Sequence, residues 1–421
     1  MPDTTVINQP LSGNLGDFLV SCLEESDFEI VNIVVAFAKN SGVLRLKSSL
    51  EQFKACGSKI NVFVGIDLDG TSYEALASLS NLADKLFVVH AESEQTFHSK
   101  IYNFTNENGS IVVVGSNNFT AGGLWTNLES CSIARLDFDK EADHAIQRQI
   151  DSYINDLVSM QGLSMEIRGQ EDVDDLLAAG YVSKEAKTRI RRETARKQVA
   201  KGGLGDVGPF IKRVRASLPP IKLEEQRKPD KPDSSLAVRK APSSASEPVF
   251  DKLDRDGNSI WFETRKMTGG SRNILDLSKK SLVSQGNPQY TAFSIDGSSA
   301  EMKGGVQFFG IDPADTDSVT DITINYNGVD YKGNTIKYPV GDKANGTWRL
   351  QIKGESAEGK NIKEAFEKDY LVNKILVFTK IEESYFFMSV FDASDLPEFI
   401  EASKVVAYNG GNTRSRLLGL W

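Results

Sequence analysis

The chain is poor in cysteine and histidine and has no long apolar run. Its three cysteines, Cys22, Cys56 and Cys131, are widely spaced and outside any CxxC pattern, which favours neither a disulfide framework nor a zinc cage and predicts buried reduced thiols. The longest apolar run, residues 30–38, is interrupted by Asn32 and is far shorter than the roughly 20 residues of a membrane helix. The N-terminus has no basic segment followed by an apolar one. We therefore expect a soluble, cytoplasmic protein without a membrane partner.

The charge is unevenly distributed over the 421 residues, a length that suits two or three domains. The net charge is −9, yet residues 184–240 hold 17 Lys and Arg against 7 Asp and Glu, or +10, so the rest of the chain carries −19. A basic segment of this kind is either a solvated helix and linker or a segment that follows phosphates. Both interpretations remain open at this stage.

Short β-rich runs alternate with helical stretches between residues 28 and 160, which is typical of an α/β layer structure with a sheet flanked by helices. One helix is expected over residues 41–56, ended by Gly57. The expected strands are FEIVNIVVAFA, KINVFVGI, KLFVVHA, HSKIYNF, SIVVVGS and LESCSIARL.

The composition changes twice beyond this region. Residues 183–201 favour a helix but have almost no apolar stripe, and the Pro-, Ser- and charge-rich residues that follow predict an extended linker. Past residue 250, β-type runs separated by turn residues, with a short helix NIKEAFEK, predict an antiparallel barrel. The expected strands are SIWFETR, QYTAFSI, VQFFGI, DITINY, TIKYPV, TWRLQI, KILVFTK and SYFFMSV. We expect domains at 1–180 and 251–421, joined by a basic helix and linker at 181–250.

Only three histidines are present, so a histidine-based mechanism has few candidates. His90 ends an apolar strand and His144 lies in a charged helix, and for both a structural or solvated role is expected. His98 differs because Lys100 follows it at the spacing that places both side chains on one face of a strand. Together they can converge on one phosphate.

Three further polar residues complete a phosphoryl-transfer site. Ser116 and Asn118 follow the strand SIVVV, and Glu129 lies in the next strand. An imidazole can attack phosphorus if a carboxylate fixes its tautomer, which is the role expected for Glu129. Lys100 and Asn118, with Ser116 or nearby backbone N–H groups, would neutralise the phosphoryl oxygens. This chemistry requires no metal and no cofactor.

The ordered pattern His98-x-Lys100, Gly115-Ser116-x-Asn118 and Glu129 resembles the phospholipase D superfamily, in particular its nuclease branch. The usual motif has an aspartate after the lysine where this chain has Thr105, a departure that also resembles restriction-endonuclease members. Superfamily enzymes use two such motifs around one site, and this sequence has one. The resemblance therefore implies a homodimer in which one His98 is the nucleophile and the other the general acid.

The C-terminal region is β-rich with polar, basic loops, and Arg and Asn side chains of such loops can contact guanine, adenine or phosphate. The whole arrangement resembles NgoFVII-type restriction endonucleases, which join a phospholipase D-like nuclease domain to a mainly-β, B3-like pseudobarrel with two DNA-binding arms. The stretch RKMTGGSRNILDLSKKS would fall in the first arm, and residues 331–349 in the second. The candidate DNA contacts are Arg265, Lys266, Ser271, Arg272, Asn273, Lys332, Asn334, Lys343, Asn345 and Arg349.

We therefore expect a homodimeric, sequence-specific, metal-independent restriction endonuclease acting on double-stranded DNA. The resemblance extends to two further partners, a cognate methyltransferase and a helicase-like ATPase subunit with which some relatives act. This chain does not supply the ATPase, because it has no GxxxxGK[ST] loop. Two alternatives remain open. One is a lipid phosphodiesterase of the same superfamily, and the other is a non-catalytic, helicase-associated DNA-binding protein that uses the nuclease fold for dimerisation.

Overall fold

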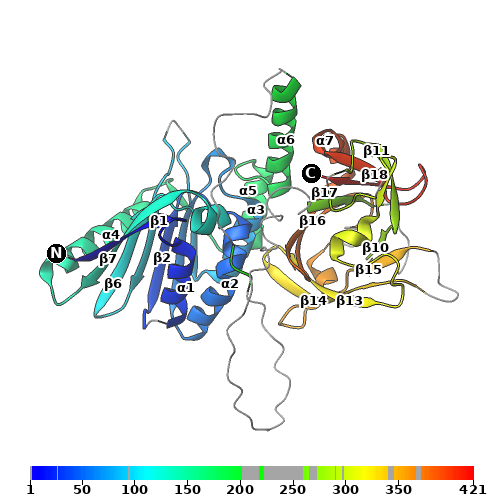
Figure 1. The fold of residues 1–421 in the computed structure, drawn as a ribbon. Coiled ribbons are helices and arrows are strands. Elements are labelled where there is room, and N and C mark those ends of the chain that lie inside the picture. The colour runs from blue at the N-terminus through cyan, green and yellow to red at the C-terminus, as the bar shows by residue number, and fades with distance from the viewer. Residues whose placement is uncertain are drawn as a thin grey trace, which may run out of the picture.

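The computed structural model describes residues 2–25, 27–92, 95–201, 218–221, 259–264, 273–289, 291–295, 298–339, 346–366 and 371–421. Two domains lie side by side, with helix α6 (Glu185–Lys201) standing between them (Figure 1). Most of the expected linker at 181–250 falls outside the described residues. Among the residues described, no helix is long and apolar enough to cross a membrane.

An eight-stranded mixed sheet forms the N-terminal domain, in the order β1-β7-β6-β5-β2-β3-β4-β8. Strands β2, β3 and β4 are parallel, and the pairs β1–β7, β7–β6, β6–β5, β5–β2 and β4–β8 are antiparallel. The bounds are β1 Asp3–Gln9, β2 Ile30–Val35, β3 Lys59–Gly65, β4 Lys85–Val89, β5 Lys100–Thr105, β6 Gly109–Gly115, β7 Glu129–Asp137 and β8 Ser164–Ile167.

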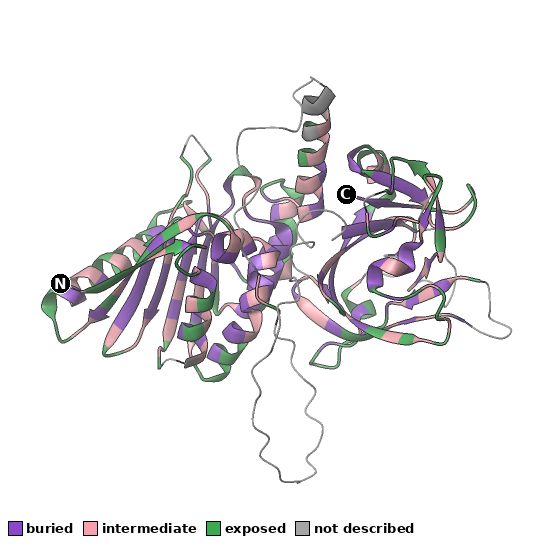
Figure 2. Ribbon diagram, viewed as in Figure 1, coloured by how far each residue is buried: buried purple, intermediate pink, exposed green. Residues whose placement is uncertain are grey.

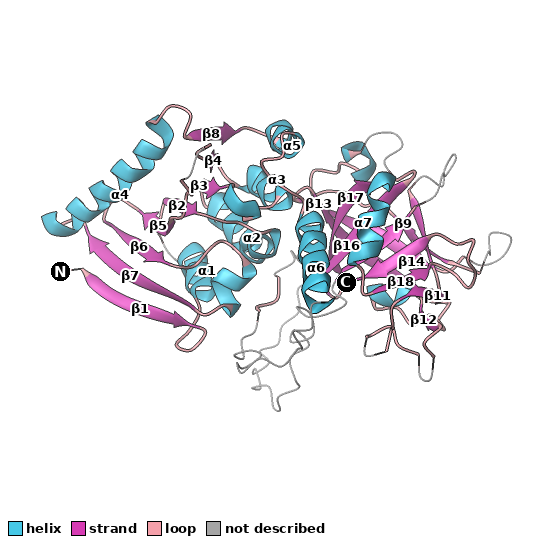
Figure 3. Ribbon diagram, turned by 90° about the horizontal axis from the view of Figure 1, so that it is seen from above, coloured by secondary structure: helices cyan, strands magenta, loops and turns pink. Residues whose placement is uncertain are grey.

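Helices cover both faces of this sheet, as the alternating pattern predicted (Figure 3). On one face, α1, α2 and α3 bury apolar side chains against strand residues such as Val31, Val62 and Tyr102. On the other face, Leu157 of α4 packs with Val34, Phe63 and Val89. The helices are α1 Leu15–Glu25, α2 Asn40–Ala55, α3 Tyr73–Leu82, α4 Glu141–Ser159 and α5 Gln170–Ala178.

The C-terminal domain is an eleven-stranded, mainly antiparallel sheet, ordered β10-β15-β14-β13-β17-β16-β9-β19-β18-β11-β12. Within the described residues the ladder does not close into a barrel, because β10 and β12 each have one strand neighbour, and β13–β17 is a parallel pair. The bounds are β9 Ser259–Glu263, β10 Ile274–Leu277, β11 Lys280–Gln285, β12 Glu301–Lys303, β13 Val319–Tyr326, β14 Val329–Lys337, β15 Trp348–Gln351, β16 Lys374–Glu382, β17 Tyr385–Asp392, helix α7 Leu396–Ala402, β18 Val405–Tyr408 and β19 Leu417–Leu420.

Two expected C-terminal strands are wrong. VQFFGI contains a 3-10 turn, Gly305–Phe309, which buries the adjacent rings of Phe308 and Phe309 in the core, whereas a strand would turn one of them outward. QYTAFSI forms turns and an isolated bridge in its described part. The expected helix NIKEAFEK is a short 3-10 turn, Ile362–Ala365, with an Asn361 capping box.

The thiols also differ in part from expectation. Cys22 and Cys131 are buried, but Cys56 is exposed just after α2. Burial raises the pKa of the Cys22 thiol to about 11, which keeps it protonated at neutral pH. Buried residues lie along the central strands and the inward-facing sides of the helices in each domain (Figure 2).

Polar contacts join the two domains. The Lys47 ammonium of α2 lies 2.6 Å from the Asp330 carboxylate of β14, and the Lys184 ammonium donates to the carbonyl of Val390 at 2.7 Å. Ser389 of β17 donates to the buried carboxylate of Glu74 in α3 at 2.8 Å. The domains are therefore held together by one buried and two partly buried polar contacts, and by the packing of Leu44 of α2 against Ile381 and Phe387.

Candidate active site

Four strand ends meet at one edge of the N-terminal sheet. The pairings Val35 with Lys100, Val114 with Ile101 and Gly115 with Cys131 bring together the ends of β2 and β6 and the beginnings of β5 and β7. The sequence from His98 to Glu129 therefore converges on one place, as the strand pattern predicted. The polar residues expected in a phosphoryl-transfer site all lie at or beside this edge.

His98 and Lys100 form a direct pair. The Lys100 ammonium lies 2.8 Å from Nδ1 of His98 and also donates to the His98 carbonyl at 2.8 Å. His98 is exposed and lies in the extended segment before β5, not inside the strand as expected, whereas Lys100 is the first residue of β5 and is buried. Since Nδ1 faces Lys100, Nε2 is the ring nitrogen available to a substrate.

Burial and charge act in opposite directions on Lys100. Desolvation lowers the pKa of its ammonium, and the nearby Glu129 carboxylate opposes that change. Glu129 therefore helps to keep the ammonium charged in a partly dry environment. A charged lysine here would meet a phosphoryl oxygen with little competition from water.

Asn118 is fixed by its side-chain oxygen. Its Oδ1 accepts a hydrogen bond from the backbone N–H of Phe37, just beyond β2, at 3.2 Å. This leaves the amide nitrogen as the group of Asn118 that can donate to a phosphoryl oxygen. The Phe37 ring meets the His98 imidazole edge to face, with centroids 5.8 Å apart, and lies 5.9 Å from the Lys100 ammonium.

Within the described residues, Glu129 contacts neighbours other than the His98 of its own chain. Ser116 Oγ donates to Oε2 of Glu129, and Asn127 Nδ2 donates to Oε1 at 3.1 Å. The expected role of orienting His98 is therefore not met inside one protomer. No sequence pattern points to Asn127 or Phe37, because their contacts depend on the folded arrangement.

Close backbone packing explains a glycine in the motif. A Cβ on Gly115 would lie 2.4 Å from Cβ of Cys131 and 2.5 Å from the carbonyl oxygen of Ser130. Only glycine allows β6 and β7 to approach this closely just before Ser116. The position of Ser116 and Asn118 thus depends on Gly115.

A buried aspartate anchors the segment that leads to His98. Asp67, after β3, accepts from the backbone N–H of Phe97 at 2.9 Å and lies 2.6 Å from Nδ1 of His90. His90 is therefore structural, as expected. Asp67 binds both His90 and the backbone of Phe97, the residue before His98. Asp67 is therefore a positioning residue, and no sequence pattern pointed to it.

The candidate DNA contacts fall into two groups. Arg265, Lys266, Ser271, Arg272, Lys343 and Asn345 lie outside the described residues. Among the rest, Asn273 donates to the carbonyl of Ile352 at 3.0 Å, Lys332 lies beside the groove between α2 and β14, and Arg349 lies 4.0 Å from Asp276, its cross-strand partner.

Asn334 does not fit a DNA contact. Its side chain is fully buried, Nδ2 donates to the carbonyl of Tyr331 at 2.8 Å, and Oδ1 accepts from the backbone N–H groups of Lys353 at 3.0 Å and Gly354 at 2.8 Å. With both ends of the amide occupied, no atom is left for a base. We assign Asn334 a structural role and withdraw it from the expected contacts.

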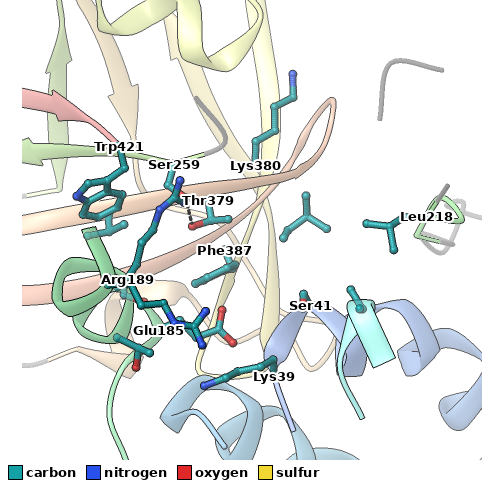
Figure 4. Close-up of a pocket in the computed structure, with 18 of the residues that line it drawn as sticks. Lys39, Ser41, Glu185, Arg189, Leu218, Ser259, Thr379, Lys380, Phe387 and Trp421 are labelled. Atoms are coloured by element: carbon teal, nitrogen blue, oxygen red, sulfur yellow. Dashed lines mark hydrogen bonds between the residues drawn. The ribbon is translucent and has the colours of Figure 1, made fainter. Parts of the chain in front are cut away.

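A hollow of about 490 Å³ lies between the two domains (Figure 4). Lys39 and Arg189 line it, but the Lys39 ammonium donates to the carbonyl of Asp69 at 2.9 Å and Arg189 donates to Ser259 Oγ at 3.0 Å. Asn127, which binds Glu129, is on its wall. The hollow therefore borders the candidate active site, while two of its cations, Lys39 and Arg189, are engaged in contacts within the chain.

No metal-binding group is evident beside these residues. In the part of the chain that the structure describes, no set of three or more His, Cys, Asp and Glu side chains is placed to hold a metal ion. The candidate site thus offers an imidazole, an ammonium, an amide, a hydroxyl and a carboxylate. This set can bind a phosphoryl group and attack it.

Solved structures with similarity to the chain include a phospholipase D family member. Nuc from Salmonella typhimurium, a phospholipase D family member, shares 15% identity over 40% of this chain and 100% of its own, with a TM-score of 0.30. NucT from Helicobacter pylori shares 14% identity over 38% of this chain and 98% of its own, with a TM-score of 0.27. Phosphatidylserine synthase from Haemophilus influenzae shares 10% identity over 47% of this chain and 46% of its own, with a TM-score of 0.31. At these values the similarities do not indicate a substrate.

No curated protein matches the chain. A family model does match: residues 15–166 fit the NgoFVII restriction endonuclease N-terminal PLD domain. The match runs from α1 to β8 and contains the whole cluster around His98. Residues 15–166 therefore form a phospholipase D-like domain of the kind that this restriction endonuclease family carries at its N-terminus.

Proposed function

We propose that the chain is a sequence-specific DNA endonuclease of a restriction system, which hydrolyses phosphodiesters without a metal in an active site shared by two subunits. The observation that carries this proposal is the His98–Lys100 pair, 2.8 Å apart, at the sheet edge where Asn118 and Glu129 also lie. The restriction-endonuclease family match over residues 15–166 supports DNA as the substrate.

The proposed reaction has two steps. Nε2 of one His98 attacks phosphorus, a P–N bond forms, the P–O bond to the leaving strand breaks, and the imidazolium of His98 of the partner subunit protonates the leaving oxygen. Water then attacks the phosphohistidine, the P–N bond breaks, and the partner's His98, now neutral, takes the proton. Lys100 and Asn118 stabilise the phosphoryl oxygens in both steps.

Two observations support a shared site. His98 is exposed although its neighbour Lys100 is buried, so the imidazole faces a surface that a second copy can cover. Glu129 contacts Ser116 and Asn127 in its own chain. In the proposed dimer, Glu129 orients the imidazole of His98 of the partner subunit, which restores the carboxylate–imidazole pairing that one protomer lacks.

The test is cleavage of unmodified bacteriophage DNA by purified protein in excess EDTA, beside His98→Ala. Discrete fragments from the wild type alone support the proposal. Activity that EDTA abolishes overturns the metal-free chemistry. Cleavage of a phospholipid in place of DNA identifies a lipid phosphodiesterase. DNA binding by both proteins with no cleavage, even when a helicase-like ATPase partner and ATP are added, identifies a non-catalytic DNA-binding protein.

The oligomeric state is measured independently. The chain has a mass of 46.3 kDa, so light scattering of a dimer gives twice that value. A species that remains monomeric while it cuts DNA would overturn the shared site.

A further inference from the structure

The loop between β18 and β19, residues 409–416, lines a groove of about 860 Å³ in the C-terminal domain. The other walls are the end of β9 at Glu263 and Thr264, the β10–β11 turn at residues 278–280, and Gly346 and Thr347 before β15. Four segments that are distant in sequence thus meet around one concave surface. Sequence patterns gave no reason to single out residues 409–416.

Hydrogen bonds fix both ends of the loop. Asn409 accepts from the backbone N–H of Ser278 at 2.9 Å and donates to the carbonyl of Asp276 at 2.7 Å. At the other end, Arg416 donates to Glu263 at 2.7 Å, and the second oxygen of Glu263 accepts from the backbone N–H of Leu417 at 3.1 Å. The loop is therefore a preorganised part of the groove.

The tip between these anchors presents a cation to solvent. Asn412 folds the tip, because its Oδ1 accepts from the backbone N–H of Arg414 at 3.0 Å and its carbonyl accepts from the N–H of Ser415 at 3.2 Å. A Cβ on Gly411 would meet nothing within 4 Å, so the backbone here borders open space. Arg414 is exposed and has no acidic partner among the described residues.

The groove has an excess of positive charge. Lys279, Lys280, Arg414 and Arg416 line it, against the two carboxylates of Glu263 and Asp276. Both carboxylates have a cation nearby, Glu263 bound to Arg416 at 2.7 Å and Asp276 4.0 Å from Arg349.

Lys279 is the second cation available to an external anion. Its ammonium lies 4.1 Å from the centroid of the Tyr338 ring, which fixes its position but leaves its charge unneutralised. Lys280, by contrast, lies 3.3 Å from Glu301. In a protein of net charge −9, a groove with two such cations selects for a polyanion.

The groove also adjoins both stretches expected to be DNA-binding arms. Thr264 immediately precedes residues 265–272, and Gly346 immediately follows residues 340–345. The first expected arm, 265–281, is described from residue 273 onward, and the second, 331–349, is described except over 340–345; residues of both, Lys279 and Gly346 among them, line this groove. The β18–β19 loop therefore lies on the same groove as described residues of both expected arms.

We infer that the β18–β19 loop is a third DNA-contacting segment, in which Arg414 binds a backbone phosphate of double-stranded DNA and Lys279 binds a second. This inference rests on the proposed function, since it presumes that the chain binds DNA. Phosphate contacts fix the position and register of the duplex without reading its sequence. The loop would thus place the DNA so that the arms can reach the bases.

The test measures binding of the full chain to a pool of short random-sequence duplexes by fluorescence anisotropy at several salt concentrations, in the His98→Ala background so that no cutting occurs. The variants are Arg414→Ala, Lys279→Ala and Arg414→Lys. The control is Lys363→Ala, which removes an exposed cation from the 3-10 turn at Ile362–Ala365, away from this groove.

Each alanine variant is expected to weaken binding about 5- to 10-fold and to reduce the salt dependence by about one phosphate contact. Arg414→Lys should retain most of the affinity, Lys363→Ala should match the parent, and all variants should melt like the parent. Unchanged affinity and salt dependence in Arg414→Ala, with a parent that binds DNA, overturn this inference alone. A parent that binds no duplex overturns it together with the proposed function.

Discussion

The Lys100 ammonium lies 2.8 Å from Nδ1 of His98. An ammonium can only donate, so the Nδ1 it faces must be unprotonated and the proton of a neutral imidazole must be on Nε2. Nε2 can attack phosphorus only when it carries no proton, so the proton of the neutral imidazole must then be on Nδ1. The proposed reaction therefore needs a carboxylate that accepts the Nδ1 proton, and among the described residues of the protomer neither Glu129 nor another carboxylate is bonded to His98. This is the physical reason for assigning Glu129 to the imidazole of a second copy.

Removal of the Lys100 charge is expected to slow cleavage strongly. Lys100→Ala should lower the single-turnover cleavage rate by about 100-fold or more, because a preorganised cation beside the phosphoryl oxygens is lost. Duplex affinity should change little, since most of the proposed contacts with DNA lie in the C-terminal domain. Lys140→Ala, an exposed lysine that pairs with Asp137, is the matched control. A Lys100→Ala rate within a few-fold of the wild type would exclude Lys100 from the chemistry.

Glu129 is expected to act across the subunit interface. Glu129→Gln and His98→Ala homodimers should both fail to release nitrophenolate in a burst from bis(nitrophenyl) phosphate, a substrate whose leaving group needs no proton. Mixing the two variants should restore a burst, because one protomer supplies His98 and the other Glu129. No burst from the mixed dimers, once their formation is verified by tagged co-purification, would show that Glu129 does not orient a partner's imidazole.

Gly115 is expected to tolerate no side chain. Gly115→Ala should destabilise the N-terminal domain by about 1–3 kcal/mol, because its Cβ would lie 2.4 Å from Cβ of Cys131. Gly169→Ala provides the control, since a Cβ there meets nothing within 4 Å. Urea unfolding measures both. Equal midpoints for the two variants would show that β6 and β7 are not packed this closely.

Glu74, which accepts a hydrogen bond from Ser389 of the C-terminal domain, is expected to make the free energy of unfolding depend on pH. Burial, followed by the charge of Glu185, raises the pKa of Glu74 from 4.5 to about 7. The folded chain therefore retains a proton that the unfolded chain releases. The stabilisation is complete below about pH 4.5 and is lost as the pH rises to about 7.

Glu74→Gln, which stays neutral, should flatten this part of the Tm–pH curve between pH 5 and pH 8 without changing the trend outside it. Calorimetry of both proteins over this range is the measurement. Parallel curves would show that Glu74 is not protonated in the folded state near neutral pH.

Much of the N-terminal fold follows from sequence because β2, β3 and β6 are rich in branched apolar residues. These three strands and β5 were each expected close to their observed bounds. Strand β1 (Asp3–Gln9) was missed because it lies at the sheet edge and five of its seven residues are exposed. Its pattern DTTVINQ shows no alternation of apolar and polar residues. Only its pairing with β7, Gln9 beside Glu129, reveals it.

The residues that make up the candidate site were predicted from the sequence, but most of their contacts were not. His98 and Lys100 do meet, but His98 precedes β5, and the partners of Glu129 are Ser116 and Asn127. Such contacts depend on loop conformations that residue spacing does not specify. In the C-terminal domain, VQFFGI has the composition of a strand, but its flanking glycines and buried adjacent rings favour a turn.

The most direct test of the central claim is to trap the phosphoenzyme. Wild-type protein is mixed with DNA in excess EDTA, quenched with alkali, digested and analysed by mass spectrometry. The account predicts a nucleotide joined through phosphorus to the peptide that contains His98, present in the wild type and absent from His98→Ala. Cleavage of the same DNA with no adduct at His98, or with an adduct that persists in His98→Ala, would contradict it.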